Sequence, residues 1–384
     1  MLKLKYKLLI LSTILLSIQP VYSQVNYQQD FDSFWTTVHT HHAYLEIQEI
    51  NWHRVREIYQ PIAESVENRG DFIRLLEQMM HELHNGHNSL NVNLSSSNRI
   101  IPSGSDIFVE RIDNRYFITD LREGFGAMKS GLEAGMEVIR FNGKPVDDQL
   151  RSFLPKYTNQ YTDEMMQYAI SMLFAGKHDT PREITVLHEG REQTFYPDSF
   201  SPDTSDGLLS FETRDDQTGI IRIHNSLANT DLIKQFDEAL DQLMEVETLI
   251  LDLTETPSGG NTTVARAIMG RFIEEELPYQ KHEFDETGFD TKRVWVEYAS
   301  PRGTPFTNEL IIKVGRWTGS MGEGIAIGFD GMKRATIIGS KMAGLLGAVE
   351  TFRLPETEIG FQIPTERLYH IDGTPRENFI PAKK

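Results

Sequence analysis

The sequence predicts a mixed α/β protein built from three consecutive parts. Residues 24–98 carry apolar side chains at helical spacing, and residues 99–200 show short apolar runs separated by turns. Residues 201–384 alternate strand-like runs with amphipathic helices, which is typical of a largely parallel sheet covered by helices. A chain of 384 residues is long enough to form two or three domains with separate cores.

The N-terminal part is expected to be helical up to a turn that carries a histidine. In its last helix the apolar side chains recur every three or four residues, at Phe72, Leu75, Leu76, Met79 and Leu83. Asn85 and Gly86 then end the helix, because these residues tolerate the backbone of a helix terminus. His87 is therefore expected on a turn just beyond a helix C-terminus.

The middle part, residues 99–200, is predicted to be a β-rich module. Its strongest turn signal is Asn142-Gly143, since both residues tolerate a positive φ. Residues 130–143, Ser-Gly-Leu-Glu-Ala-Gly-Met-Glu-Val-Ile-Arg-Phe-Asn-Gly, resemble part of a PDZ domain. The resemblance implies a module that binds an extended chain terminus by adding a strand, and the alternative is a PDZ-like spacer without a ligand.

The third part is predicted to contain four strands and several helices. The strands are expected at residues 219–223, 248–253, 310–314 and 335–339, with helices at 232–243 and 264–272. The polar residues 274–305 show little periodicity, and no element is predicted for them. Active sites in parallel sheets lie beyond the carboxyl ends of the strands, where Gly259-Gly260 and Ser320 are both expected.

Ser320 is expected at a junction between a strand and a helix. The unpaired N–H groups of a helix N-terminus favour negative charge, so this is a suitable position for a nucleophilic serine. Ser320 and Glu323 also have the spacing of a capping box, in which each side chain bonds to the other residue's backbone. Taken alone, this pattern favours an ordinary helix cap over a nucleophile.

The composition excludes several classes of partner and site. A net charge of −18 argues against nucleic acid or an anionic membrane as the main partner. Residues 1–23 have the basic start, short apolar stretch and small residues of a secretory signal peptide; an uncleaved N-terminal anchor is the alternative. We expect an exported protein, periplasmic or extracellular, without stable membrane insertion after cleavage. The chain has no cysteine, so disulfides and thiolate metal sites are excluded.

Four motifs in order resemble those of a known family of secreted serine peptidases. Residues 83–89 resemble its Gly-Asp-Gly-His-Thr turn, residues 249–261 its Asp-Leu-Arg-x-Asn-x-Gly-Gly loop, residues 318–323 its Thr-Ala-Ser-Ala-x-Glu segment and residues 338–344 its Gly-x-x-Thr-x-Gly segment. The family includes carboxy-terminal processing proteases, tricorn core peptidases and interphotoreceptor retinoid-binding protein. The resemblance covers essentially the whole mature chain and implies a ClpP/crotonase-like α/β catalytic core in residues 201–384.

The resemblance also indicates which branch of the family is closer. One branch pairs the serine with a lysine just after the Gly-x-x-Thr-x-Gly segment, but residues 344–347 contain no lysine, and Lys341 lies inside the segment. The tricorn-like branch uses serine, histidine and glutamate. His87 occupies the position of that histidine, and Glu377 lies where the family carries its glutamate.

The resemblance implies a complete set of catalytic roles. Ser320 would be the nucleophile and His87 the general base, oriented by Glu377. The oxyanion would be held by the N–H of Met321 and by that of Gly259 or Gly260. No cofactor and no metal are implied, and the expected partner is a polypeptide or peptide substrate. A metal site formed by His81, His84 and His87 is disfavoured because the Asn-Gly break follows His84.

The sequence departs from the family pattern at three places. Gly86 stands where the tricorn-like branch has a serine before the histidine. The glycine-rich loop lacks its usual arginine and asparagine, and the terminal Pro-Asp is Pro381-Ala382. These departures leave open a second function: a catalytically silent homologue that binds peptides or lipids.

Overall fold

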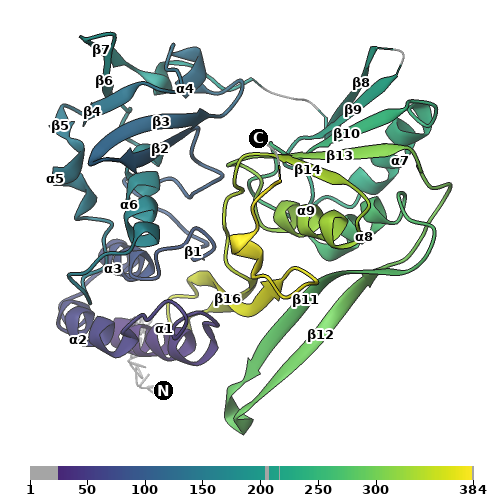
Figure 1. Ribbon diagram of the computed structural model, residues 1–384. Coiled ribbons are helices and arrows are strands. Elements are labelled where there is room, and N and C mark those ends of the chain that lie inside the picture. Colours follow the sequence, from purple (N-terminus) through teal and green to yellow (C-terminus); the bar gives the residue numbers. More distant parts are fainter. Residues whose placement is uncertain (1–24, 204–206, 216, 383–384) are drawn as a thin grey trace, which may run out of the picture.

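The computed structural model describes residues 25–203, 207–215 and 217–382, which pack around three hydrophobic cores (Figure 1). The predicted signal peptide, residues 1–23, lies outside the described residues. Within the described ranges, no helix combines the length and the apolar character needed to cross a membrane.

The N-terminal helices are α1 (Tyr27–His41), α2 (Trp52–Ala63) and α3 (Arg69–His81), followed by the short strand β1 (Ser89–Leu90). Each helix begins at an asparagine whose side chain accepts a hydrogen bond from the N–H three residues later: Asn26, Asn51 and Asn68. Their apolar faces form one core, which Phe361 and Ile363 complete from near the other end of the chain. This is why α1 lies beside β16 (Gly360–Tyr369) in Figure 1.

The middle module has its own sheet and core. Its elements are β2 (Ile107–Ile112), β3 (Arg115–Leu121), α4 (Gly126–Lys129), β4 (Glu137–Phe141), β5 (Lys144–Pro145), α5 (Val146–Leu150), α6 (Asp163–Ala175), β6 (Ile184–His188), β7 (Arg191–Phe195) and η1 (Pro197–Ser199). The strand order is β2-β3-β4-β6-β7, and β5 pairs with β4. Asn142 and Gly143 both have positive φ in the turn between β4 and β5, as predicted.

The third part contains the predicted parallel sheet, with the order β14-β13-β10-β9-β8. Its strands are β8 (Leu209–Asp215), β9 (Thr218–Ile223), β10 (Thr248–Asp252), β13 (Glu309–Val314) and β14 (Thr336–Gly339). Helices α7 (Leu232–Gln242), α8 (Thr262–Met269) and α9 (Met321–Gly331) pack with it. Strands β9, β10, β13 and β14 are parallel, while β8 runs antiparallel at the edge. The predicted α/β class is confirmed.

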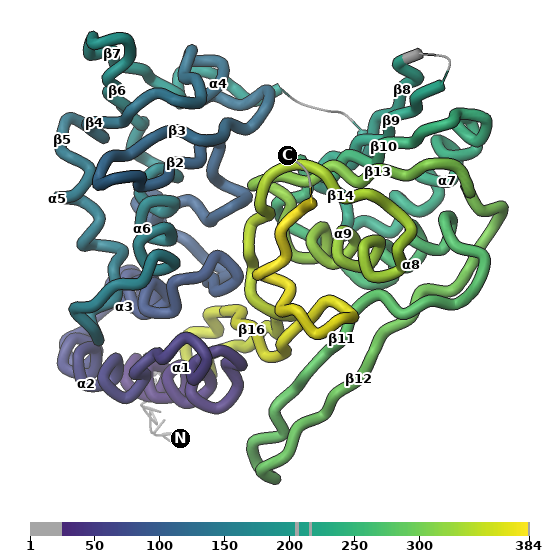
Figure 2. The backbone as a smooth tube through the Cα atoms, in the orientation of Figure 1, coloured from purple at the N-terminus to yellow at the C-terminus, as the bar shows by residue number. Residues whose placement is uncertain are grey.

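A second sheet joins the third part to the N-terminal helices. It has the order β1-β16-β11-β12, with β15 (Ala348–Arg353) paired to β16. Strands β11 (Leu277–Glu286) and β12 (Thr291–Ala299), joined by η2 (Thr287–Phe289), occupy the segment for which no element was predicted. In Figure 2 this hairpin extends away from the rest of the chain. The last element is η3 (Arg376–Asn378).

Candidate active site

Two loops meet at the carboxyl edge of the parallel sheet. One follows β10 and the other follows β13, and these strands are parallel neighbours. Thr256 and Thr318 form a parallel bridge between the loops. The N–H of Thr256 donates to Trp317 O (3.1 Å), and the N–H of Gly319 donates to Thr256 O (3.2 Å). These bonds hold the glycine-rich loop beside the segment that leads into α9.

Ser320 lies at the N-cap of α9 in a strained backbone conformation. Its φ is 51° and its ψ is −110°, although positive φ is uncommon for a residue with a Cβ. Its N–H donates to Glu323 Oε2 at 2.7 Å, which is one half of the predicted capping box. The conformation costs about 1–3 kcal/mol and is kept only because surrounding bonds enforce it. Such strain is typical of a residue whose side chain must point in a set direction.

His87 contacts Ser320 across 233 positions of sequence. Its Nε2 lies 3.1 Å from Ser320 Oγ. The turn that carries His87 is fixed by Asn85, whose Oδ1 accepts the N–H of His87 at 3.0 Å. The structure thus brings the predicted nucleophile and the predicted base within hydrogen-bonding distance.

The other ring nitrogen of His87 has a backbone partner. Nδ1 lies 2.6 Å from the carbonyl oxygen of Leu346. Because a carbonyl only accepts hydrogen bonds, Nδ1 carries the proton and the lone pair of Nε2 faces Ser320. Burial, together with the nearby Arg376 charge, lowers the pKa of His87 to about 4. The ring is therefore neutral at neutral pH, as a general base must be.

Glu377 makes no hydrogen bond to His87. Leu346 O, rather than the predicted Glu377, occupies the position beside Nδ1. Burial raises the pKa of Glu377, and its Oε2 has no hydrogen-bond partner among the described residues. A backbone carbonyl has no sequence signature, so no pattern could have named Leu346 in advance.

Gly259 and Gly260 have different surroundings. A Cβ on Gly259 would lie 2.4 Å from Ser320 Cβ and 2.9 Å from Met321 N, so only glycine allows this approach. The N–H of Gly259 donates to Thr256 O at 3.1 Å and is therefore engaged. By contrast, the N–H groups of Gly260 and Met321 have no acceptor in the part of the chain that the structure describes. Both N–H groups are therefore free to bind a ligand group beside Ser320.

The other histidines of the predicted turn face different partners. His81 Nδ1 contacts Tyr168 Oη (3.0 Å), and His84 Nδ1 contacts Glu82 O (3.3 Å). The described ranges contain no group of three or more His, Cys, Asp or Glu side chains placed to hold a metal ion. Lys341, the other conceivable base, has an exposed side chain.

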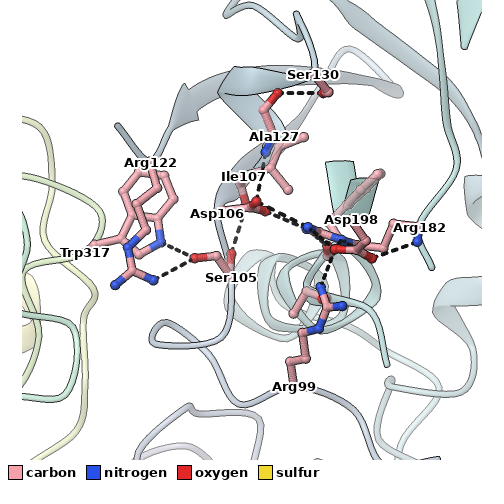
Figure 3. Close-up of polar contacts among 12 residues, drawn as sticks. Arg99, Ser105, Asp106, Ile107, Arg122, Ala127, Ser130, Arg182, Asp198 and Trp317 are labelled. Carbon is pink, nitrogen blue, oxygen red and sulfur yellow. Dashed lines mark hydrogen bonds and ion pairs between the residues drawn. The ribbon is translucent and has the colours of Figure 1, made fainter. Parts of the chain in front are cut away.

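The middle module contacts both loops of the site. Arg122 donates through Nε to both carboxylate oxygens of Glu255 (3.1 and 3.0 Å), a residue of the glycine-rich loop. Trp317, three positions before Ser320, donates through Nε1 to Ser105 O at 2.8 Å. Figure 3 shows Trp317 and Arg122 next to Ser105 of the middle module. The neighbouring Arg182 bridges Asp106 and Asp198, which holds this side of the module together.

Gly86 is packed too tightly to be replaced by serine. A Cβ at this position would lie 2.5 Å from the carbonyl oxygen of Ile101. We therefore expect Gly86→Ser, which restores the family's serine, to lower the free energy of unfolding by about 1–3 kcal/mol and not to raise activity. Urea denaturation and peptide hydrolysis would check this, and a gain in kcat with unchanged stability would contradict it.

Two family models match parts of this chain. The family model of peptidase family S41 matches residues 217–380, and that of the tricorn protease C1 domain matches residues 23–81. Mature CPAF has the same fold, with a TM-score of 0.65 at 14% identity, covering 93% of this chain and 92% of that chain. The photosystem II D1 C-terminal processing protease superimposes with a TM-score of 0.57 at 16% identity, covering 93% of both chains.

A peptidase candidate from Parabacteroides merdae has a TM-score of 0.57 at 12% identity and covers 93% of this chain and 89% of that chain. At such identities the solved structures show a shared fold alone. The family models identify which regions of the chain are related to known peptidase domains. The motifs around Ser320 and Gly259 lie inside the first matched region, and the N-terminal helices lie inside the second. Residues 217–380 of the chain form a peptidase family S41 domain, and the chain is a serine-type peptidase.

Proposed function

We propose that this chain is an exported peptidase that hydrolyses peptide bonds through an acyl-enzyme on Ser320, with His87 as the general base. The observation that carries this proposal is the 3.1 Å contact between His87 Nε2 and Ser320 Oγ. It joins a turn after α3 to the N-terminus of α9, at the edge where parallel sheets place their active sites.

In the acylation step, His87 Nε2 takes the proton of Ser320 as Oγ attacks the carbonyl carbon of the peptide bond. The oxygen of that carbonyl becomes an oxyanion, for which the N–H groups of Met321 and Gly260 are the free donors. Gly259 keeps the space beside Ser320 open. The C–N bond then breaks, and the imidazolium returns the proton to the leaving amine.

In the deacylation step, a water molecule replaces the amine. His87 removes a proton from this water, which attacks the acyl carbon. The C–O bond to Ser320 then breaks, the imidazolium returns the proton to Ser320 Oγ, and the carboxylic acid is released. The Leu346 carbonyl accepts from Nδ1–H throughout and stabilises the imidazolium that forms in each step. Glu377, proposed from the resemblance as the orienting residue, makes no direct bond to the ring, and the side-chain charge that perturbs the His87 pKa is that of Arg376.

The middle module is proposed to be PDZ-like, as the sequence resemblance suggests. Its strand β2 lies at the edge of the sheet, where strand addition takes place. However, Gln167 of α6 donates to the Val109 carbonyl of this strand at 2.9 Å. A chain terminus that paired with this carbonyl would have to replace that bond, which favours the alternative of a spacer.

The proposal is tested with the mature chain and a fluorophosphonate reagent, which labels activated serines. We expect labelling of Ser320, none in Ser320→Ala, and strongly slowed labelling in His87→Ala. Turnover of casein or of a fluorogenic peptide should follow the same order. Absence of both labelling and turnover in folded protein would instead support a silent homologue that binds peptides or lipids.

A further inference from the structure

The loop of residues 344–347 supplies the hydrogen-bond acceptor for His87. It lies between β14 and β15 and is part of neither strand. Its Leu346 carbonyl accepts from Nδ1 at 2.6 Å. A shift of this loop would change the tautomer or the direction of the His87 ring, so something must hold the loop in place.

Glu323 bonds to the loop and to the nucleophile at the same time. Its Oε1 accepts the N–H of Gly344 (2.9 Å), and its Oε2 accepts the N–H groups of Leu345 (3.3 Å) and Ser320 (2.7 Å). The residue is only 1% exposed. One buried carboxylate therefore fixes the distance between Ser320 and the loop that faces His87.

Arg376 holds the same loop from its carbonyl side. Its Nη2 donates to Leu345 O (2.7 Å) and to Gly347 O (2.9 Å), the carbonyls on either side of Leu346. It is also 1% exposed, and it lies 4.0 Å from Glu323 Oε2. Asn85 adds a third attachment, since its Oδ1 accepts the N–H groups of both His87 (3.0 Å) and Leu346 (3.2 Å).

We propose that Glu323 and Arg376 are positioning residues that hold the loop of residues 344–347, so that Leu346 keeps His87 directed at Ser320. This inference rests on the proposed function of Ser320 and His87. Burying an ion pair is costly, so stability alone does not account for this pair. Here the five bonds of Glu323 and Arg376 all go to the loop or to Ser320.

The pH dependence of activity follows from the same contacts. The groups that face the Glu323 carboxylate are the Arg376 guanidinium and the N–H groups of Ser320, Gly344 and Leu345. Burial raises the pKa of Glu323 to about 7, against the opposing effect of these partners. The carboxylate accepts all three N–H bonds only when ionised. Activity should therefore fall as the pH drops through about 7, well before His87 is protonated near 4.

The experiment compares Glu323→Gln, Arg376→Met and Arg376→Lys with a matched control. Asp30→Asn is suitable, because Asp30 is also fully buried and accepts two backbone N–H groups of a loop, those of Glu356 and Thr357, far from Ser320 in the fold. In each folded variant we would measure kcat and KM for a peptide, the rate of fluorophosphonate labelling, the pH profile and the thermal midpoint.

We expect Glu323→Gln and Arg376→Met to lower kcat about 10- to 100-fold with little change in KM. Arg376→Lys should recover part of the loss. The acid limb near pH 7 should disappear in Glu323→Gln, because glutamine does not titrate. In ¹H NMR, the low-field Nδ1 proton of His87 should be lost in both variants and kept in Asp30→Asn, whose kcat should match the parent.

Two results would overturn the positioning role: a loss of stability in Glu323→Gln with an unchanged pH profile and Nδ1 signal, or a larger loss of kcat in Glu377→Gln than in Glu323→Gln. The second would place the orienting role on Glu377. Either result is distinct from failure of the proposed function, in which the parent chain itself would show neither labelling of Ser320 nor peptide turnover.

Discussion

Replacing His87 by alanine should lower kcat/KM for peptide hydrolysis by about 10⁴- to 10⁶-fold. Without the ring, Ser320 Oγ loses the acceptor that lies 3.1 Å away, and no other base is in contact with it among the described residues. KM should change little, because His87 acts on the reacting atoms rather than on substrate binding. The change is measured with a fluorogenic peptide at pH 8, where Glu323 is ionised.

His224→Ala is the matched control for this prediction. His224 Nε2 makes the same kind of contact with a serine, 2.9 Å from Ser210 Oγ, but on the hairpin of β8 and β9 and without a helix N-terminus behind the serine. Its removal should leave kcat/KM unchanged. If His87→Ala kept most of the activity, a different base would have to be sought, and Lys341→Ala would be the next variant to measure.

The position of the site could be predicted because it follows from strand order alone. Leu249 to Leu251 and Leu310 to Ile312 are continuous apolar runs, as buried parallel strands require, and they pair with each other. Because parallel neighbours end at the same edge, the loops after them had to meet. Gly259 and Ser320 could thus be placed together without knowledge of the fold.

The hairpin of β11 and β12 could not be predicted because two of its buried positions carry polar side chains. Gln280 and His282 are buried on β11, where a sheet normally carries aliphatic side chains. They bond to each other at 2.9 Å, and Trp295 of β12 stacks on the His282 ring. His282 Nδ1 also lies 2.9 Å from Glu366 Oε2 on β16, so the burial of this ring depends on a tertiary contact, and the alternation that marks a strand is hidden in the sequence.

The environment of His87 was only partly accessible from the sequence. The chemistry of a side chain such as Ser320 or Glu323 is known from the residue type, whereas the Leu346 carbonyl is chemically the same as every other backbone carbonyl. Its role depends on how residues 344–347 fold back toward the turn after α3, which is a long-range contact. Arg376 was not predicted as a site residue, because the neighbouring Glu377 matched the family pattern and was assigned the orienting role.

Replacing Gly259 by alanine should lower kcat/KM by about 10²- to 10³-fold, the size of effect seen when an oxyanion donor is lost. The new Cβ would lie 2.4 Å from Ser320 Cβ and 2.8 Å from Ser320 Oγ, so either the serine or the loop must move. Movement of the loop displaces the adjacent Gly260 N–H, and movement of the serine lengthens its contact with His87. Both reduce kcat, which is measured by pre-steady-state hydrolysis of an activated ester.

Gly143→Ala separates this effect from backbone strain. Gly143 has a φ of +74°, close to the +64° of Gly259, but a Cβ there would meet nothing within 4 Å. Both variants should therefore lose about 1–2 kcal/mol of stability from the left-handed conformation, whereas only Gly259→Ala should lose acylation rate. Equal acylation rates in the two variants would mean that the loop of residues 253–261 does not form part of the oxyanion site. The absence of a Cβ at Gly259 would then matter only because it lets the loop approach closely enough to form the bridge between Thr256 and Thr318. This bridge holds the loop against the segment before Ser320.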